Sequence, residues 1–175
     1  STVQLTAEGA ITAGKPCIIE ADGDVAQVAQ SSTSQGVGSE ITYESASIGG
    51  LSFGATPAFD SNSNRSVFGY HDGSNSLKGT AVVVSASGTT LTAGTPVVFN
   101  TNGATYDITC VFDSANNKVI VVYKDGGNGS YGTAIVGTVD SSDNSISFGT
   151  ATVFNSAAST HTAAAFDSNA GTVVI

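Results

Sequence analysis

Two segments of the chain place an aromatic ring, a carboxylate and an amide at one spacing. Residues 70–75 and residues 123–128 both follow the pattern Tyr-x-Asp-Gly-x-Asn. An aromatic face combined with directed hydrogen-bonding groups suits the binding of sugar hydroxyls. Asp-Gly and Asn are also ordinary turn residues, so a purely structural role at the edge of a sheet is the alternative. The candidate glycan-binding residues are Tyr70, Asp72, Asn75, Tyr123, Asp125, Asn128 and Tyr131.

A weak metal candidate precedes the first of these segments. Asp60, Asn62 and Asn64 have the D-x-N-x-N spacing that opens a calcium-binding loop. The sixth position of that loop requires glycine and holds Arg65, and no glutamate follows at the loop's last ligand position. A hairpin turn therefore explains these residues better than a cation site, and we expect no cofactor.

The residues for nucleophilic or metal-dependent catalysis are sparse. His71 and His161 have no neighbouring ligand at metal-binding spacing. Arg65 is the only arginine, which excludes a sialidase-type arginine cluster. A glycosidase needs only two suitably separated carboxylates, so the acidic residues leave that class open. We expect a protein that is not an enzyme.

Composition narrows the remaining classes. The 175 residues include 5 basic and 14 acidic side chains, for a net charge of −9, which makes nucleic-acid binding very unfavourable. No apolar run is long enough to span a membrane. Charged residues make up only 11%, and Ser, Thr, Asn and Gly replace them, as in chains of strands and tight turns. Cys17 and Cys110 are expected to be free thiols rather than a disulfide.

The chain also repeats itself. Phe-Asp-Ser begins at residues 59, 112 and 166, Tyr-x-Asp-Gly at 70 and 123, and Gly-Thr-Ala at 79 and 132. The spacing is 53 or 54 residues at these landmarks and 55 at the end of the unit. Such a period indicates a repeat architecture. We expect a unit at 59–111, a second at 112–165 and a partial third at 166–175.

Each unit is predicted to be a four-stranded antiparallel sheet. In the second unit we expect strands at 108–112, 118–123, 133–139 and 145–154, the last broken near Gly149, with turn residues between them. The middle strands are apolar at consecutive positions, which predicts cover on both faces of the sheet. The fold is therefore expected to be all-β and propeller-blade-like, with an array that is incomplete in this chain. Stacked sandwich modules and a solenoid are the alternatives.

The first forty residues differ from the rest. Residues 1–40 are predicted to form a small β module or docking arm, with a tight turn at Asp22 and Gly23 between two strands, and a Ser/Gln/Gly-rich linker at 30–38. Residues 41–175 then hold the β repeats.

The unit from Phe112 to Gly149 resembles a repeat found in long structural proteins of marine bacteriophage particles, of the tail-fibre or capsid-decoration type. Residues 11–25 are similar, over a short stretch, to the start of small β-rich phage head-decoration proteins. The resemblance implies a virion component that binds other virion proteins or copies of itself, and adheres to host cells or cell-surface glycans. The alternatives are a bacterial extracellular adhesin or fibril-forming repeat protein, and a glycan-hydrolysing β-propeller.

Overall fold

The structure is a computed structural model that describes residues 7, 9–11, 13, 17–19, 24–27, 38, 40–45 and 57–175. The chain divides into two compact units, Ser1–Gly36 and Val37–Ile175. In the first unit, β1 (Cys17–Ile19) pairs antiparallel with β2 (Val25–Gln27). The expected turn at residues 22–23, and most of the expected linker at 30–38, lie outside the described residues.

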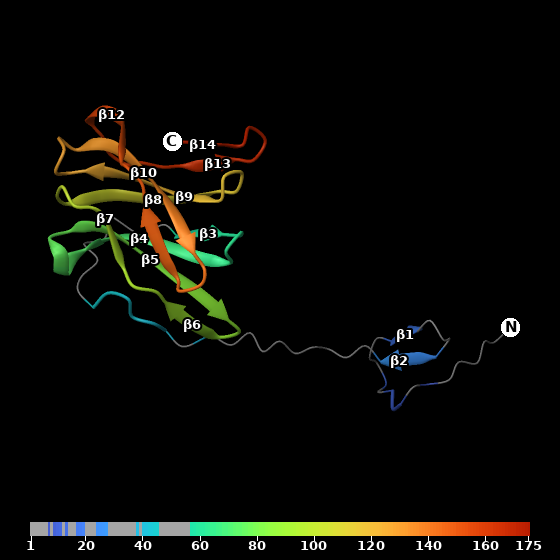
Figure 1. Cartoon of the computed structure of the whole chain (residues 1–175). Coiled ribbons are helices and arrows are strands. Elements are labelled where there is room, and N and C mark those ends of the chain that lie inside the picture. The colour runs from blue at the N-terminus through green and yellow to red at the C-terminus, as the bar shows by residue number, and fades with distance from the viewer. Residues whose placement is uncertain are drawn as a thin grey trace. The chain divides into compact units, whose positions relative to one another are not determined.

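The second unit contains three antiparallel sheets, which we number in chain order (Figure 1). Sheet I consists of β3 (Pro57–Asp60), β4 (Arg65–Asp72), β5 (Lys78–Ser87), β6 (Thr90–Ala93) and β7 (Val97–Asn100). Sheet II consists of β8 (Thr105–Asp113), β9 (Lys118–Asp125), β10 (Tyr131–Asp140), β11 (Ser145–Phe148) and β12 (Thr152–Ala158). Sheet III is the hairpin of β13 (Ala165–Asp167) and β14 (Thr172–Val174).

Sheets I and II have the same strand order. In sheet I the strands lie in the order β3-β4-β5-β6, and in sheet II in the order β8-β9-β10-β11. The last edge of each sheet is shared by two short strands, because β7 also pairs with β5 and β12 also pairs with β10. A glycine lies at each break: the backbone N–H of Gly94 donates to the Val83 carbonyl (2.8 Å), and that of Gly149 to the Val136 carbonyl (2.9 Å).

The first hairpin of sheets I, II and III closes in the same way. An aspartate carboxylate accepts two backbone N–H bonds from the turn at Asp60, Asp113 and Asp167. The preceding phenylalanine pairs with the residue seven positions later in all three, as Phe112 does with Val119. Aspartate favours this turn because its short side chain reaches its own backbone two residues on.

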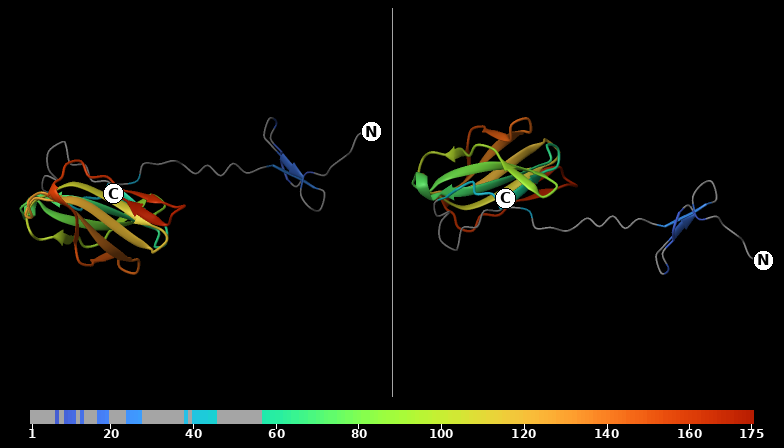
Figure 2. Two further views of the ribbon diagram at one scale, coloured as in Figure 1. Left: turned by 90° about the horizontal axis from the view of Figure 1, so that it is seen from above. Right: turned by 90° about the horizontal axis from the view of Figure 1, so that it is seen from below.

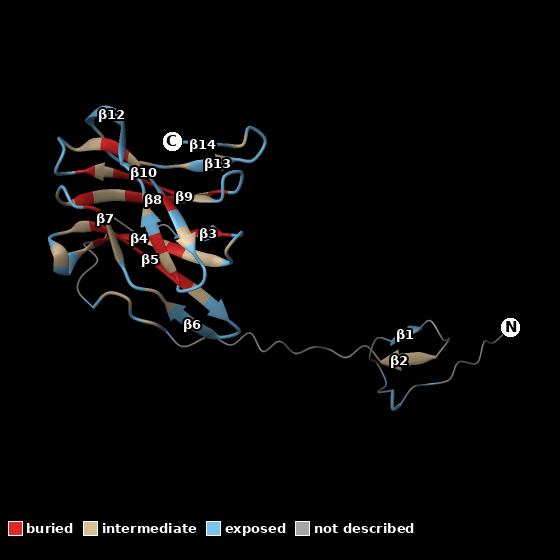
Figure 3. Cartoon of the chain, in the orientation of Figure 1, coloured by how far each residue is buried: buried red, intermediate tan, exposed pale blue. Residues whose placement is uncertain are grey.

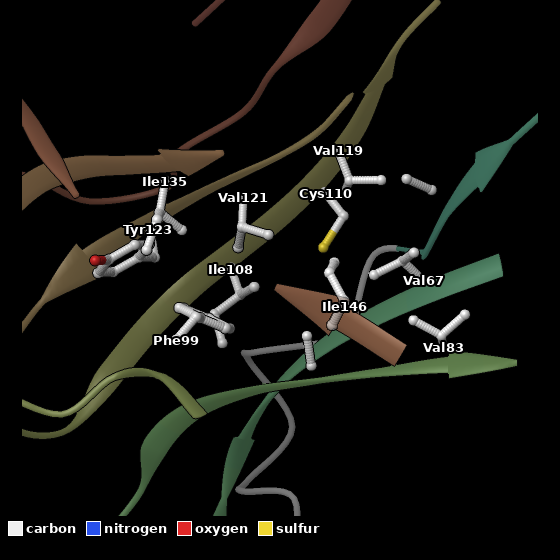
Figure 4. Packing of buried hydrophobic residues seen from close by; sticks show 12 residues of the cluster. Val67, Val83, Phe99, Ile108, Cys110, Val119, Val121, Tyr123, Ile135 and Ile146 are labelled. Carbon is white, nitrogen blue, oxygen red and sulfur yellow. The ribbon is translucent and has the colours of Figure 1, made fainter. Parts of the chain in front are cut away.

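Sheets I and II pack face to face around one core. Figure 4 shows the apolar side chains of both sheets pointing into the space between them. Twelve buried residues form this cluster: Ala58, Val67, Ala81, Val83, Phe99, Ile108, Cys110, Val119, Val121, Tyr123, Ile135 and Ile146. The adjacent positions on β9, Ile120 and Val122, are also buried, although they point to the opposite face. The strand is therefore covered on both sides at residues 119–123; Figure 3 colours the strands by burial, with buried residues in red.

The opposite face of sheet I carries a smaller cluster. Tyr70, Val82 and Val84 are buried there, with Phe68 and Ala93 packed beside them. Ile41 and Tyr43 lie against this face from the segment that precedes the sheet. Figure 2 shows the sheets as successive layers when the unit is viewed along a second direction.

The expectation of an all-β chain is confirmed. Apart from the single 3-10 turn η1 (Gly73–Asn75), every regular element in the described residues is a strand. The sheets are open, and the described strands form no closed ring. No helix among the described residues is long and apolar enough to cross a membrane. The repeat and its propeller-like arrangement stay predictions.

Candidate functional site

The two tyrosines of the candidate glycan site are buried. Tyr70 is 2% exposed because Ile41 and Tyr43 lie against its face of sheet I, and Tyr123 is 1% exposed because it lies in the core between sheets I and II. The Tyr123 ring lies 5.2 Å from the ring of Phe99, and the Tyr70 ring lies 5.3 Å from that of Tyr43. Burial, followed by the charge of Asp125, raises the pKa of Tyr123 to about 12. Neither ring offers a face to a ligand in solution.

Asp72 closes the turn after β4. Its Oδ1 accepts hydrogen bonds from the backbone N–H groups of Ser74 (2.9 Å) and Asn75 (3.1 Å) and from the Ser74 hydroxyl. Slight desolvation raises the pKa of Asp72, but hydrogen bonds with the side chains of Ser74 and Glu44 and with the turn backbone outweigh it and hold the pKa below its ordinary value. The carboxylate of Asp72 therefore stabilises the 3-10 turn η1 by accepting its hydrogen bonds.

Asp125, at the equivalent place at the end of β9, is buried and joins the two sheets. Its Oδ1 accepts from the Asn100 side-chain amide (3.1 Å) and from the Gly127 backbone N–H (3.0 Å). Its Oδ2 accepts from the side-chain amide of Asn102 (3.3 Å). Asn100 also donates to the hydroxyl of the fully buried Thr105 (2.9 Å). A buried negative charge is stable only when hydrogen-bond donors surround it. The Asp125 carboxylate therefore fixes the positions of the loops that carry its donors.

The remaining predicted residues are more accessible. Asn128 is exposed, and its carbonyl accepts the Tyr131 backbone N–H (3.1 Å) in the turn that Asp125 begins. Tyr131 is partly buried beneath Gly129, and Asn75 is partly buried at the end of η1. Asn128 and Tyr131 are thus the predicted residues that a glycan can reach most directly, and glycan binding stays a prediction.

The structure brings the two predicted loops to one end of the sheets through residues that the sequence patterns did not single out. The segment 101–106 lies between them: the Thr105 N–H donates to the Leu77 carbonyl (2.9 Å), and the Gly126 N–H donates to the Ala104 carbonyl (2.9 Å). The ring nitrogen Nδ1 of His71 lies 3.2 Å from the Thr105 carbonyl oxygen. The signal for this segment is the Phe-Asn pair at 99–100, which recurs at 154–155.

The metal candidate at residues 60–64 has a structural use. Asp60 is buried, and its two carboxylate oxygens accept three hydrogen bonds from the turn, from the N–H groups of Asn62 and Ser63 and from the Ser63 hydroxyl. Asn64 has a positive φ of 56°, which closes the hairpin. Among the described residues no group of three or more His, Cys, Asp or Glu side chains could hold a metal ion.

The cysteines do not form a disulfide. Cys110 is in the core between sheets I and II, and burial raises the pKa of its thiol to about 12 against a lowering hydrogen bond with the Gly69 backbone. Cys17 is exposed on β1. Cys110 is therefore a packing residue.

A second junction joins the sheets at their other end. Arg65 of β4 donates from Nε to the side-chain oxygen of Asn144 (2.5 Å) and from a terminal nitrogen to the Ser141 carbonyl (2.7 Å), both in the β10–β11 turn. The amide of Asn144 donates to the Ser85 hydroxyl (3.0 Å) and to the Thr92 carbonyl (3.2 Å). The only arginine of the chain is thus used to bind sheet I to sheet II.

Within the segment 38–45, the described residues 38 and 40–45 make contacts with sheet I that correspond to those that β7 makes with sheet II. The pairs Phe99–Tyr123 and Tyr43–Tyr70 have nearly equal ring separations and the same interplanar angle of 56°. A side chain on Gly94 would overlap the Asn144 carbonyl oxygen of sheet II, and one on Gly38 would overlap the Thr89 carbonyl oxygen of sheet I. The spacing from the glycine to the ring is five residues in both segments.

This correspondence extends to the next residue. Asn100 follows Phe99 and donates to Asp125, while Glu44 follows Tyr43 and shares a hydrogen bond with Asp72. Residues 38–45 therefore cover the outer face of sheet I as the last strand of a preceding sheet would. The pattern Gly-x-x-x-x-(Phe/Tyr) begins at residues 38, 94 and 149, and it also begins at residues 54 and 126.

Comparison of the chain with protein-family models, curated proteins and solved structures gives no match.

Proposed function

We propose that the chain is a non-enzymatic structural component of a phage virion, a capsid-decoration or fibre protein, built from repeats of about 53 residues that stack like propeller blades. The observation that carries the proposal is the correspondence between residues 38–45 and β7. The same kind of contact is made twice in the chain, by residues 38–45 on sheet I and by β7 on sheet II. A repeated contact of this kind suits a protein built by stacking similar sheets.

The use of the carboxylates supports a structural role over a catalytic one. Asp60, Asp72, Asp113 and Asp140 each accept hydrogen bonds from the turn that they begin. Hydrogen bonds from the turn hold the pKa of Asp113 and of Asp140 below the ordinary value, with the Asn116 and Ser142 side chains as their largest causes. A general acid needs a raised pKa instead.

Adhesion is the second element of the proposal. Asn128 and Tyr131 place an amide and a partly exposed ring on one turn at the end of sheet II. Weak binding of glycans by such a turn would gain strength from many copies on one particle. Glycan-array binding by the chain coupled to beads, lost in Asn128→Ala and Tyr131→Ala and retained in Ser142→Ala, tests this element alone.

Imaging of the native assembly tests the virion proposal. Particles purified from the source culture and labelled with antibodies to this chain are expected to carry the label on a capsid or a tail. Label on an extended protein fibril without a capsid or tail would instead establish the extracellular fibril alternative. Turnover of a polysaccharide by the purified chain, lost on replacing one carboxylate, would contradict the non-enzymatic assignment.

A further inference from the structure

We propose that Asn128 is a site of spontaneous deamidation, where the side chain reacts with the backbone nitrogen of Gly129 and is converted to aspartate or isoaspartate. Asn-Gly occurs twice in the chain, at residues 102–103 and 128–129. Asparagine is one of the thermally labile residues of proteins, and its reactivity depends on the residue that follows it and on the local structure. The modification itself is independent of glycan binding, whereas its consequence for adhesion rests on the proposed function.

The reaction needs only the chain and water. The backbone nitrogen of Gly129 loses its proton to solvent base and attacks Cγ of the Asn128 side chain. A bond forms between that nitrogen and Cγ, the bond from Cγ to the amide nitrogen breaks, and the amide nitrogen takes a proton from water and leaves as ammonia. Water then opens the five-membered ring at either carbonyl, which gives aspartate or isoaspartate without oxidation or reduction. Glycine favours the attack because it has no Cβ to obstruct its nitrogen and its backbone turns freely.

The turn after β9 leaves both reacting groups accessible. Asn128 and Gly129 are exposed, and no group in the described part of the chain bonds the Asn128 side-chain amide or accepts the Gly129 N–H. Gly129 and Ser130 have positive φ values of 63° and 61°, and the Asn128 carbonyl accepts the Tyr131 N–H (3.1 Å), as in a type I′ turn. The side-chain amide and the attacking nitrogen can therefore approach each other without breaking a hydrogen bond of either group.

The other Asn-Gly pair is held in place. The side-chain amide of Asn102 donates to the buried carboxylate of Asp125 (3.3 Å). A Cβ on Gly103 would lie 2.9 Å from the Cα of Gly127, so the backbone at Gly103 has little room to rotate. We therefore expect slow reaction at Asn102 and fast reaction at Asn128, although both are followed by glycine.

The corresponding turn of sheet I has the same backbone and a different residue after the asparagine. Ser76 and Leu77 have positive φ values of 56° and 60°, close to those at residues 129–130. Serine follows Asn75 in place of glycine, and its Cβ obstructs the attack. Ser76 is exposed although sheet II is packed on sheet I, so this turn stays accessible when another sheet follows.

The contact that the following segment makes with the turn is also the same in the two sheets. After sheet I, the Thr105 N–H donates to the Leu77 carbonyl (2.9 Å). After sheet II, the Ser159 N–H donates to the Ser130 carbonyl (2.8 Å). The accessibility of Asn128 is therefore a property of the turn itself.

Deamidation changes the turn that we propose to bind glycans. Both products replace the Asn128 amide donor with a carboxylate, which only accepts hydrogen bonds when it is charged. In isoaspartate the carbonyl that accepts the Tyr131 N–H becomes a free carboxylate, and the main chain gains one carbon. The turn then cannot keep its hydrogen bond and its ring in place, so we expect adhesion to decline as the protein ages.

Peptide mapping of the aged full chain tests the modification. The folded chain is kept in warm, mildly alkaline buffer, then unfolded and digested with chymotrypsin, and mass spectrometry measures the exchange of an amide NH₂ for OH. We expect Asn128 to convert at least about tenfold faster than Asn102 and Asn75. In urea-unfolded chain, where the turn contacts are absent, Asn102 and Asn128 should convert at similar rates. Gly129→Ala should slow conversion at residue 128 at least about tenfold, and Ser76→Gly should speed it at Asn75 by a similar factor.

Equal rates at Asn102 and Asn128 in the folded chain would overturn the proposal, and so would an Asn128 that converts only in the unfolded chain. Glycan-array binding by fresh and aged samples of the same preparation tests the consequence for adhesion. Binding that survives full conversion of Asn128 would contradict that consequence. Conversion in a chain that binds no glycan even when fresh would leave the modification standing and contradict only the adhesion element of the proposed function.

Discussion

Asn100 donates a hydrogen bond of 3.1 Å from its side-chain amide to the buried carboxylate of Asp125, and so joins the end of β7 in sheet I to the end of β9 in sheet II. The same amide donates to Thr105, where the next strand begins. One side chain therefore fixes the relative position of two sheets and of the segment that connects them.

Replacement of this amide by a carboxylate should be costly. Asn100→Asp sets two acids against each other in a buried place, and we expect the free energy of unfolding at pH 7 to fall by about 2–3 kcal/mol in urea titrations. The matched change Asn155→Asp lies on the exposed equivalent position and should cost under about 0.5 kcal/mol. Equal losses in the two variants would contradict the role of the Asn100–Asp125 bond.

Glycines 94 and 149 lie at equivalent breaks in the last strand of their sheets and should respond differently to a methyl group. In Gly94→Ala the new Cβ overlaps the Asn144 carbonyl oxygen, so we expect a loss of about 1–3 kcal/mol. In Gly149→Ala the nearest atom, the Val136 carbonyl oxygen, is 3.7 Å away, which is ordinary contact. Thermal melting should show a lowered Tm for the first variant and little change for the second.

Arg65 and Lys118 occupy the same place in the first hairpins of sheets I and II, opposite Asp60 and Asp113. Arg65→Ala removes the bonds to Asn144 and Ser141, and we expect a loss of about 1–2 kcal/mol in chemical denaturation. Lys118→Ala removes only an exposed bond to the Thr138 hydroxyl and should cost less than about 0.5 kcal/mol. A larger effect at Lys118 would show that the β10–β11 turn does not anchor sheet I.

Acid should weaken the fold through its turns. The pKa values of Asp72, Asp113 and Asp140 are lowered in the folded chain, so their contribution is present above the ordinary aspartate pKa and is lost as pH falls through the folded values. We expect Tm to decline below about pH 4. The triple Asp→Asn variant keeps an acceptor oxygen in each turn, so its Tm should depend less on pH in that range; an unchanged slope would contradict this assignment.

Much of the fold follows from local sequence. The turn residues between strands, such as Asp113 to Asn117 and Asp140 to Asn144, mark the ends of β8 to β11 because only certain residues accept these backbone conformations. The break of the last strand at Gly149 lies where it was expected.

The sequence does not reveal which face of each strand meets which neighbour. Strands such as β9 are apolar at consecutive positions, so no alternation distinguishes the two faces, and the burial of Tyr70 and Tyr123 could not be anticipated from their turn-like surroundings. The role of residues 38–45 is not evident from the sequence for a related reason. Tyr43 and Glu44 replace the Phe-Asn pair of the later segments, so the shape of the contact is preserved although the residue types differ.

That correspondence is the central claim, and Glu44→Asn tests it most directly. If residues 38–45 act as β7 does, an amide at position 44 should donate to Asp72 as Asn100 donates to Asp125, in place of the hydrogen bond that Glu44 shares with Asp72. We predict a higher Tm at pH 7 for Glu44→Asn than for the unchanged chain. A Tm that stays the same or falls would contradict the claim that this segment takes the place of a last strand.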